Sequence, residues 1–320
     1  MRKRWLPLLA ACLLPALAAA QGFPERPPRI LGGFAAGGTS DIVNRILAES
    51  ATQTLGQRPV VEVRTGANGF IAAAEAARSA PDGHTIVQCS TGMLTISPEL
   101  PGVQTPIDPA RDLLPIANFA HSTQVMAVTA NSPHQTVAGF LDAARARPGT
   151  LTYASAGIGS VSHLSGARLE QMARVRLVHV PFRGAAPGVL DVLAGRVDTI
   201  ITNLGDVAQQ VRGGEMRLLA FADGIGMDGF SGVGQVGDTV PGYAVSGWFG
   251  YCAPRGTPEP VVARWADAIR AATEDPATRQ RLLQNGLVPR FEDPARFSQT
   301  IAADRAAWGA VIRSGNIRAE

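Results

Sequence analysis

The chain has 320 residues, of which 46% are hydrophobic and 17% are charged, enough to bury the cores of two ordinary domains and too apolar for a disordered protein. The formal net charge of +3 includes Arg2, Lys3 and Arg4 near the N-terminus; without them the count is 29 − 3 = 26 basic against 26 acidic residues, a net charge of zero. A nucleic-acid partner, which requires a basic surface, is therefore not expected.

Lysine and cysteine are scarce, which limits the chemistry. Lys3 is the one lysine, so the chain beyond the leader has no amine for a Schiff base or a Walker-type phosphate loop. The cysteines, Cys12, Cys89 and Cys252, show no spacing typical of a zinc site, and we expect neither a metal nor another cofactor. Cys89 and Cys252 could pair in an oxidising compartment, but we expect two buried free thiols.

The N-terminus predicts export. Residues 1–20 have a basic start, a short apolar stretch and the small residues Ala18, Ala19 and Ala20, the pattern of a secretory signal peptide cut after Ala20. We therefore expect the mature protein in the periplasm. A lipoprotein anchored through Cys12 is the alternative, and the very short apolar stretch before Cys12 argues against it.

The chain that follows alternates strands and helices. The patterns predict strand 29–34, helix 41–55 with Thr39 or Ser40 as its N-cap, strand 60–63, helix 71–79 and strand 84–89. A second series has strand 124–129, helix 137–147, strand 151–154, helix 162–174, strand 178–181, helix 186–194 and strand 199–201. A loop at 224–242, strand 248–253 and helices 258–273, 276–285 and 294–314 complete the chain. Such alternation is typical of an α/β fold with mainly parallel sheets flanked by helices.

We expect two lobes. Residues 21–122 and 247–320 form a discontinuous first lobe, because the three successive C-terminal helices have little sheet of their own to cover. Residues 123–246 form the second lobe. Crossover strands near residues 123 and 246 join the lobes, and a cleft between two lobes is a common place for a ligand.

Each predicted lobe has a glycine-containing turn before a helix, residues 36–41 (AGGTSD) in the first and 155–160 (SAGIGS) in the second. The first N–H groups of a helix lack intrahelical acceptors and carry partial positive charge, and glycine lets a ligand approach the backbone. Two such turns facing each other could grip an anion. Ordinary chain reversal is the alternative, and neither turn completes a phosphate-binding motif.

At these residues the sequence resembles the periplasmic solute-binding receptors of tripartite tricarboxylate transporters, the Bug or TctC family. The resemblance runs from about Pro24 to the C-terminus and includes segments 34–41 (FAAGGTSD), 80–85 (APDGHT), 151–160 (LTYASAGIGS), 179–184 (HVPFRG) and 247–250 (GWFG). It implies a two-lobed periplasmic binding fold of type II that closes on a small organic anion without catalysis. It also implies a membrane permease as partner, or alternatively a sensor kinase, and we expect a monomer.

The resemblance further implies the ligand contacts, because family members hold a ligand carboxylate mainly through main-chain N–H groups and water at the two turns. The residues carried over are Ala36, Gly37, Gly38, Thr39 and Asp41 in the first lobe and Ser155, Gly157, Gly159, Ser160, His163, Arg183 and Asn203 in the second. The chain departs from the family pattern at Ala36, within residues 63–69, where Asn68 stands, around Asn203 and in residues 224–238. These departures leave the identity of the ligand open.

Several of these side chains also have a structural interpretation. Asp41 can favour the positive start of its helix, His163 can cap the turn beside it, and Arg183 can be a surface charge. An exported α/β enzyme that acts on a carboxylic acid is the alternative function, with Ser160, His163 and Asp41 as its available groups. The absence of a partner acid and of a nucleophile elbow argues against a serine hydrolase.

Overall fold

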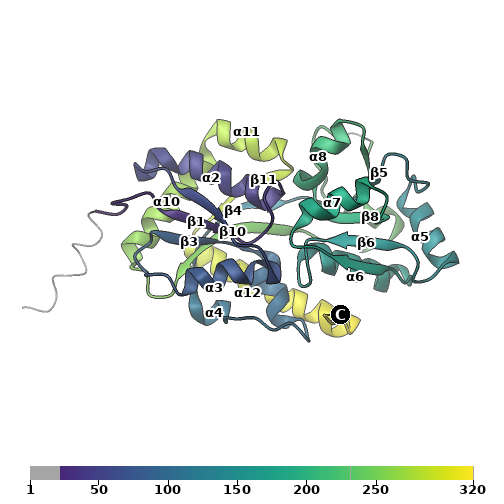
Figure 1. Cartoon of the computed structure of the whole chain (residues 1–320), viewed down its shortest axis with the longest axis horizontal. Helices are drawn as coiled ribbons and strands as arrows, with labels where there is room; N and C mark the ends of the chain where they lie inside the picture. The colour runs from purple at the N-terminus through teal and green to yellow at the C-terminus, as the bar shows by residue number, and fades with distance from the viewer. Residues whose placement is uncertain (1–21, 231, 320) are drawn as a thin grey trace, which may run out of the picture.

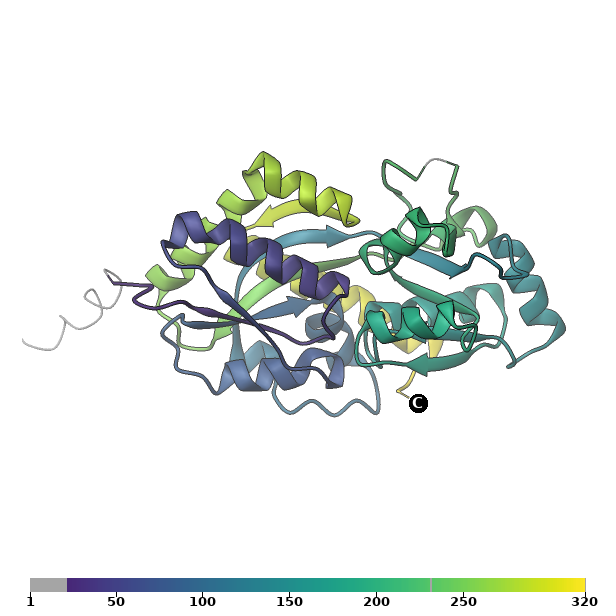
Figure 2. The same cartoon turned by 45° about the horizontal axis from the view of Figure 1, so that its top comes forward.

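Two β-sheets, each covered by helices on both faces, form the two lobes of the molecule (Figures 1 and 2). The computed structural model describes residues 22–230 and 232–319. The expected signal peptide, its cleavage after Ala20 and the alternative anchor at Cys12 lie outside the described residues. Within them, no helix is both long and apolar enough to cross a membrane.

The first lobe has a six-stranded sheet in the order β11-β4-β10-β3-β1-β2. Its strands are β1 (Arg29–Gly32), β2 (Val60–Val63), β3 (Thr85–Ser90), β4 (Leu113–Ser122), β10 (Gly247–Pro254) and β11 (Leu287–Glu292). Its helices are α2 (Thr39–Leu55), α3 (Phe70–Ala77), α4 (Pro109–Asp112), α10 (Glu259–Glu274), α11 (Pro276–Gln284) and α12 (Pro294–Gly315), with the short turns η1 (Ala67–Gly69), η2 (Gly92–Ile96) and η3 (Ser97–Glu99).

The second lobe has a five-stranded sheet in the order β7-β6-β8-β5-β9. Its strands are β5 (Gln124–Thr129), β6 (Thr152–Ser155), β7 (Val178–Pro181), β8 (Thr199–Asn203) and β9 (Met216–Phe221). Its helices are α5 (Val137–Ala146), α6 (Val161–Ala173), α7 (Ala185–Leu193), α8 (Leu204–Arg212) and α9 (Val236–Thr239). The two-lobed α/β fold predicted from the sequence is therefore confirmed.

Three details of the predicted fold are wrong. The sheets are mixed, because β10 and β11 in the first sheet and β5 in the second run antiparallel to their neighbours. The N-cap of α2 is Gly38, and Thr39 is the first helical residue. The expected loop at 224–242 contains the short helix α9. Its N-terminus is capped by reciprocal hydrogen bonds between Gln235 and Asp238, a capping box.

Aspartate–proline pairs set the start of three helices. Asp108, Asp275 and Asp293 are the N-caps of α4, α11 and α12, and each is followed by a proline at the first helical position. Each carboxylate accepts a main-chain N–H from the first turn, and proline has no N–H that would stay unpaired there. The sequence thus specifies these boundaries locally.

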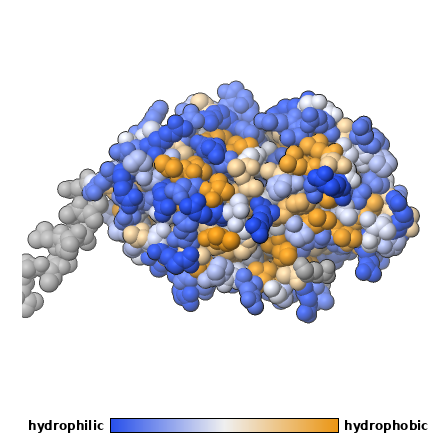
Figure 3. Space-filling view, viewed as in Figure 1, coloured by the Kyte–Doolittle hydropathy of each residue, from blue (hydrophilic) through white to orange (hydrophobic). Residues whose placement is uncertain are grey.

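Alternation of side chains along the strands fills the cores on both faces of each sheet. In β1, Ile30 packs in the cluster under α2 and α10, whereas Leu31 packs with Phe70 of α3 on the opposite face. The last turns of α12 leave the first sheet: Trp308 lies in the core of the second lobe with Phe140. Figure 1 shows α12 running beneath the first sheet toward the second lobe, where it contacts α6. Figure 3 shows the surface of the molecule from the same side as Figure 1. Hydrophilic side chains cover most of it, with apolar patches between them.

Cys89 and Cys252 form a disulfide, which corrects the expectation of free thiols. β3 and β10 are antiparallel neighbours in which Cys89 faces Gly250 and Cys252 faces Val87, so both side chains point to the same side of the sheet. Their Cα atoms lie 6.1 Å apart, a separation that a disulfide spans. Their separation of 163 positions along the chain hid this proximity from the sequence.

Candidate functional site

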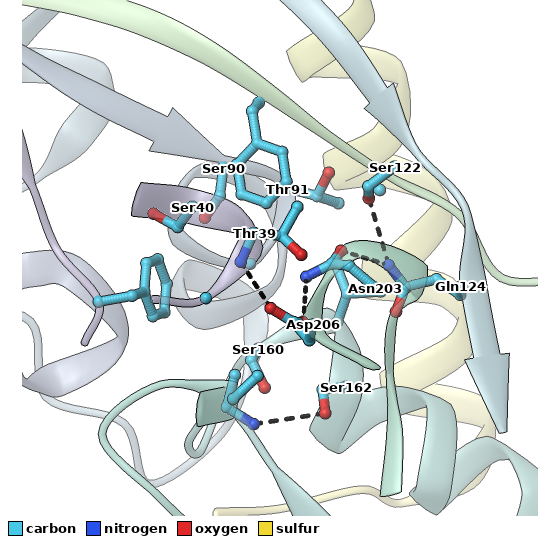
Figure 4. A pocket seen from close by; sticks show the side chains of 18 of the residues that line it. Thr39, Ser40, Ser90, Thr91, Ser122, Gln124, Ser160, Ser162, Asn203 and Asp206 are labelled. Atoms are coloured by element: carbon cyan, nitrogen blue, oxygen red, sulfur yellow. Dashed lines mark hydrogen bonds between the residues drawn. The ribbon is translucent and has the colours of Figure 1, made fainter. Parts of the chain in front are cut away.

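A pocket lies between the lobes, and four helices begin at its wall. These helices are α2, α6, α7 and α8, represented in the wall by Thr39, Ser160, Ala185 and Asn203 (Figure 4). The ends of β3, β4 and β10 complete it. The cavity measures about 60 Å³, space for only a few water-sized groups.

The lobes touch each other across this pocket. The main-chain N–H of Thr39 donates to Asp206 Oδ1 of the second lobe at 2.6 Å. Asn68 Nδ2 donates across the cleft to the carbonyl oxygen of Gly159 at 2.9 Å. The structure therefore has the lobes in a closed arrangement, held by direct hydrogen bonds.

The first glycine turn depends on a group from the other lobe. Gly37 has φ of +85°, a conformation that favours glycine, and its N–H donates to Asp41 Oδ2 at 3.1 Å. Asp41 also pairs with Arg45 at 2.9 Å, so its carboxylate holds the turn and the first helical turn together. Two residues further on, the N–H of Thr39 reaches Asp206 across the cleft. Asp206 of the second lobe thus accepts a hydrogen bond from the first turn of α2 in the first lobe.

The second glycine turn is held by side chains of its own lobe. Ser160 is the N-cap of α6 and accepts the N–H of His163, while the N–H of Gly159 donates to His163 Nδ1 at 3.2 Å. The N–H of Gly157 donates to Ser155 Oγ at 3.1 Å. These main-chain groups are therefore already satisfied within the lobe.

Two histidines behind this turn are kept neutral. The His163 ring stacks on the His179 ring with centroids 4.3 Å apart, and Ser155 Oγ lies 2.6 Å from His179 Nε2. Burial lowers the pKa of His163 to about 4. Burial, and secondarily the neighbouring His163, lowers the pKa of His179 to about 3. A neutral His163 is what the Gly159 N–H requires, because a protonated ring has no acceptor nitrogen.

The described residues of the pocket wall include one charged side chain, Asp206, and no basic one. Asp206 is 9% exposed, and its Oδ2 accepts from Thr202 Oγ1 at 2.6 Å and from Asn203 Nδ2 at 3.0 Å. Asn203 Oδ1 in turn accepts from Gln124 Nε2 at 2.7 Å. Positive potential in the pocket therefore comes from helix starts and not from side-chain cations.

The structure brings four of the twelve predicted site residues into the pocket wall: Gly38, Thr39, Ser160 and Asn203. The other eight lie around it. Gly37 and Asp41 shape the first turn, and Ala36 is exposed beside it. Ser155, Gly157, Gly159 and His163 build the second turn. The Arg183 side chain is exposed, and its main-chain oxygen accepts the N–H of Ala35 across the cleft at 3.2 Å.

Sequence reasoning missed Gln124 and Asp206 as members of the wall. Asp206 occupies the first turn of α8, where an acidic residue is ordinary, and Gln124 begins β5 directly after the crossover from β4. Asn68 carried a signal, because it departs from the family pattern. It adopts φ of +52° in η1 and lies in the wall.

The geometry does not assemble a hydrolytic centre from the groups considered. Ser160 Oγ donates to the carbonyl oxygen of Gly157 and accepts from the N–H of His163, and the His163 ring is bonded to Gly159. Asp41 is paired with Arg45. Within the described part of the chain, no three His, Cys, Asp or Glu side chains are grouped so as to hold a metal ion.

Comparison with known proteins adds a family. Residues 43–317 match the family described as "Tripartite tricarboxylate transporter family receptor". A UPF0065 protein from the tcbD-tcbE intergenic region of Pseudomonas sp. strain P51 is 33% identical over 292 residues, which cover 91% of this chain and 86% of that protein.

Two solved structures from Rhodopseudomonas palustris are also similar. Rpa4515 with adipate is 30% identical with a TM-score of 0.89, over 92% of this chain and 99% of that one. MatC with bound malate is 29% identical with a TM-score of 0.84, over 91% of this chain and 100% of that one.

Proposed function

The chain belongs to the family of tripartite tricarboxylate transporter receptors, which are periplasmic solute-binding proteins, and on that premise we propose that it captures a small carboxylate in the pocket between its lobes. One observation carries the proposal. Four helix starts meet at a pocket whose described wall has no basic side chain. Neutral N–H donors at helix starts are suited to a carboxylate and need no counter-charge from lysine or arginine.

The similar structures support this choice of ligand class. The Rhodopseudomonas palustris relatives carry adipate in one case and malate in the other, and both acids are dicarboxylates. The contacts we assign to the carboxylate are the wall residues Gly38, Ser160 and Asn203, with the hydroxyl of Thr39, whose N–H is already held by Asp206. The remaining residues of the two turns hold the turn conformations through hydrogen bonds and do not contact the ligand.

The mechanism is closure of the lobes on the ligand. Residues 21–122 with 247–320 move against residues 123–246, and the strands β4–β5 and β10 form the connection. An acid that bridges the two lobes binds the closed form better and shifts the population toward it. Hydrogen bonds join the lobes across the pocket, so we expect exchange of ligand to require opening.

The receptor acts as a monomer in the periplasm and hands the acid to a membrane permease of the tripartite tricarboxylate type. No catalysis is proposed, since the Ser160 hydroxyl and the His163 ring are each hydrogen-bonded to main-chain groups and not to one another. Delivery to a sensor kinase is the alternative fate of the loaded receptor. Uptake of labelled acid into cells that carry or lack the permease separates the two.

Isothermal titration with mono-, di- and tricarboxylates tests the proposal. The matched variants are Gly92→Val and Gly139→Ala. A Cβ at Gly92 would meet the Gly159 carbonyl oxygen at 3.0 Å across the cleft, whereas one at Gly139 would meet only Thr136 Oγ1 of its own helix cap at 3.3 Å. We expect the wild type and Gly139→Ala to bind one acid with similar affinity and Gly92→Val to lose binding. Absence of heat with every acid would contradict the proposal.

A further inference from the structure

Three buried polar atoms of the pocket-wall residues have no hydrogen-bond partner in the described protein. They are Thr39 Oγ1, Asn68 Oδ1 and Gln124 Oε1. Their residues are 0%, 8% and 1% exposed, respectively. Buried polar groups of native proteins are nearly always paired, so unpaired ones at a ligand pocket indicate what the ligand brings. Two of the three atoms are carboxamide oxygens, which can only accept.

The orientation of Gln124 follows from the charge of Asp206. A carboxylate only accepts hydrogen bonds, so it draws the Nδ2 of Asn203 toward itself, at 3.0 Å. Asn203 then turns Oδ1 toward Gln124, which must answer with Nε2, at 2.7 Å. The same Nε2 also reaches Ser122 Oγ at 3.2 Å. Figure 4 shows this relay, with the nitrogen of Gln124 on the side of Asn203 and Ser122. The oxygen of Gln124 is left as an unpaired acceptor.

The orientation of Asn68 is fixed independently from the first lobe. Its Nδ2 donates to the main-chain oxygen of Gly159 and to Ser97 Oγ, both at 2.9 Å. Because a main-chain carbonyl can only accept, the amide nitrogen must face it. The Oδ1 of Asn68 therefore also remains an unpaired acceptor. The carboxamides of Gln124 and Asn68 are oriented by different neighbours, and in both the oxygen is left as an unpaired acceptor.

Asp206 further limits where a ligand carboxylate can sit. Its Oδ1 takes the Thr39 N–H at the start of α2, so a ligand anion is directed to the other helix starts. Gln124 and Asn68 both line the pocket, so a ligand seated there with a plain hydrocarbon chain leaves their acceptor oxygens unpaired. An unpaired buried acceptor weakens binding, and a donor on the ligand removes that loss.

We propose that this receptor selects carboxylates that also bear a hydroxyl or ammonium group, and that Asp206 determines this selectivity by setting the direction of the Asp206–Asn203–Gln124 relay. The inference rests on the proposed function and narrows its ligand class. Asp206 acts through Asn203 and Gln124, and the ligand donor binds at the acceptor end of the relay.

The test compares acids of one length that differ in a single group. Succinate, L-malate and L-aspartate carry hydrogen, hydroxyl and ammonium at the same carbon, and adipate with its 2-hydroxy and 2-amino derivatives repeats the series at greater length. Titration of the wild type should give about tenfold tighter binding for a hydroxyl- or ammonium-bearing acid than for the plain acid of its length, the value of one buried hydrogen bond.

The variants are Asp206→Asn and Gln124→Met, with Asp142→Asn as the matched control. An asparagine at 206 can still accept the Thr39 N–H, but its amide nitrogen lets Asn203 and Gln124 turn over, so Gln124 offers a donor. Asp206→Asn should bring the ratio of affinities to one or favour the plain acid. Gln124→Met removes the acceptor and should bring the ratio near one. Asp142, in α5 and on the surface, loses only an exposed ion pair, and its variant should keep the wild-type ratio.

The ratio distinguishes selectivity from general damage, because partial misfolding lowers the affinity for all acids equally. Equal binding of plain and donor-bearing acids by the wild type overturns the inference and leaves the proposed function standing. An unchanged ratio in both Asp206→Asn and Gln124→Met overturns the role of the relay. If no mono-, di- or tricarboxylate binds the wild type, these six included, the proposed function falls and the inference with it.

Discussion

The two lobes support the same pocket by different means. The first lobe has a disulfide in its sheet, between Cys89 and Cys252, yet the glycine turn that it offers to the pocket is completed by Asp206 of the other lobe. The second lobe has no cysteine, and its glycine turn is held by Ser155, Ser160 and His163 of the same lobe. The second lobe thus presents a preformed surface, whereas the first acquires its final form when the lobes close.

Removal of the disulfide should have the largest effect and should be confined to the first lobe. The double variant Cys89→Ala/Cys252→Ala is expected to lower the free energy of unfolding by about 2–5 kcal/mol, because the bridge closes a loop of 163 residues between two buried positions. Hydrogen exchange should show faster exchange in β1, β3 and β10 and little change in β6 and β8. Equal loss of protection in both sheets would contradict the separate support of the lobes.

The next largest effect is expected from alanine substitution of one glycine in each glycine turn, Gly37 in the first lobe and Gly159 in the second. Gly159 and Gly37 have φ of +81° and +85°, so alanine strains both by about 1 kcal/mol. A Cβ at Gly159 would meet Ser97 Oγ of the other lobe at 2.3 Å, whereas one at Gly37 would meet nothing within 4 Å. Gly159→Ala should therefore also hinder closure and weaken acid binding by about 100-fold, or about 2.7 kcal/mol.

Gly37→Ala serves as the control for that strain, and its binding should stay within about threefold of the wild type. Titration gives the affinities, and small-angle scattering gives the radius of gyration with saturating acid. Gly159→Ala should keep the larger radius of gyration of the open form even with acid present. Similar affinities for the two variants would mean that the approach of Gly159 to Ser97 does not matter for closure.

Acid should unfold the second lobe through its histidines. In the unfolded chain His163 and His179 have pKa values near 6.5, and folding lowers these pKa values to about 4 and about 3. The unfolded state therefore binds more protons, and stability falls as the pH decreases from about 6.5 toward 4 and then 3. Protonation of His163 also removes the acceptor of the Gly159 N–H.

Urea unfolding at pH 7.5, 5.5 and 4.5 measures this loss. His179→Gln, which keeps a hydrogen-bonding group near Ser155, should reduce the dependence of the midpoint on pH. It should not abolish the dependence, because His163 remains and burial also lowers the pKa of His121 in the first lobe to about 4. An identical pH dependence in the variant and the wild type would exclude His179 as a source.

The smallest effect separates a structural Asp41 from a ligand-binding one. Asp41→Asn keeps an acceptor for the Gly37 N–H and loses only the pair with the exposed Arg45, so stability should fall by about 0.5 kcal/mol. Acid affinity should change by less than about threefold. A much larger loss of affinity with intact stability would place Asp41 in contact with the ligand.

Much of the fold could be predicted because its signals are local. Aspartate–proline pairs start α11 and α12, and helical spacing of apolar residues marks α2. The strands β4 and β11 escaped prediction because β4 lies between β10 and β11, and β11 at the edge of the first sheet, through pairing between distant segments and not through alternation along the chain. The disulfide escaped for the same reason, since only the register of β3 and β10 brings the two cysteines together.

The residues of the candidate site also divide into those with a local sequence signal and those that depend on contacts between distant segments. Gly38, Thr39, Ser160 and Asn203 belong to segments with a recognisable pattern and lie in the wall. Asp206 and Gln124 could not be found in this way, because their importance arises from hydrogen bonds between segments up to 167 residues apart. A first-turn acid such as Asp206 looks the same in sequence whether it serves its own helix or reaches across a cleft.

A crystal structure of the protein with the acid that it retains on purification, identified by native mass spectrometry, tests the central claim most directly. We predict that the acid lies between the lobes, with a carboxylate at the starts of the wall helices and no basic side chain within hydrogen-bond distance. An acid bound outside this pocket, or a carboxylate held by an arginine, would contradict the account.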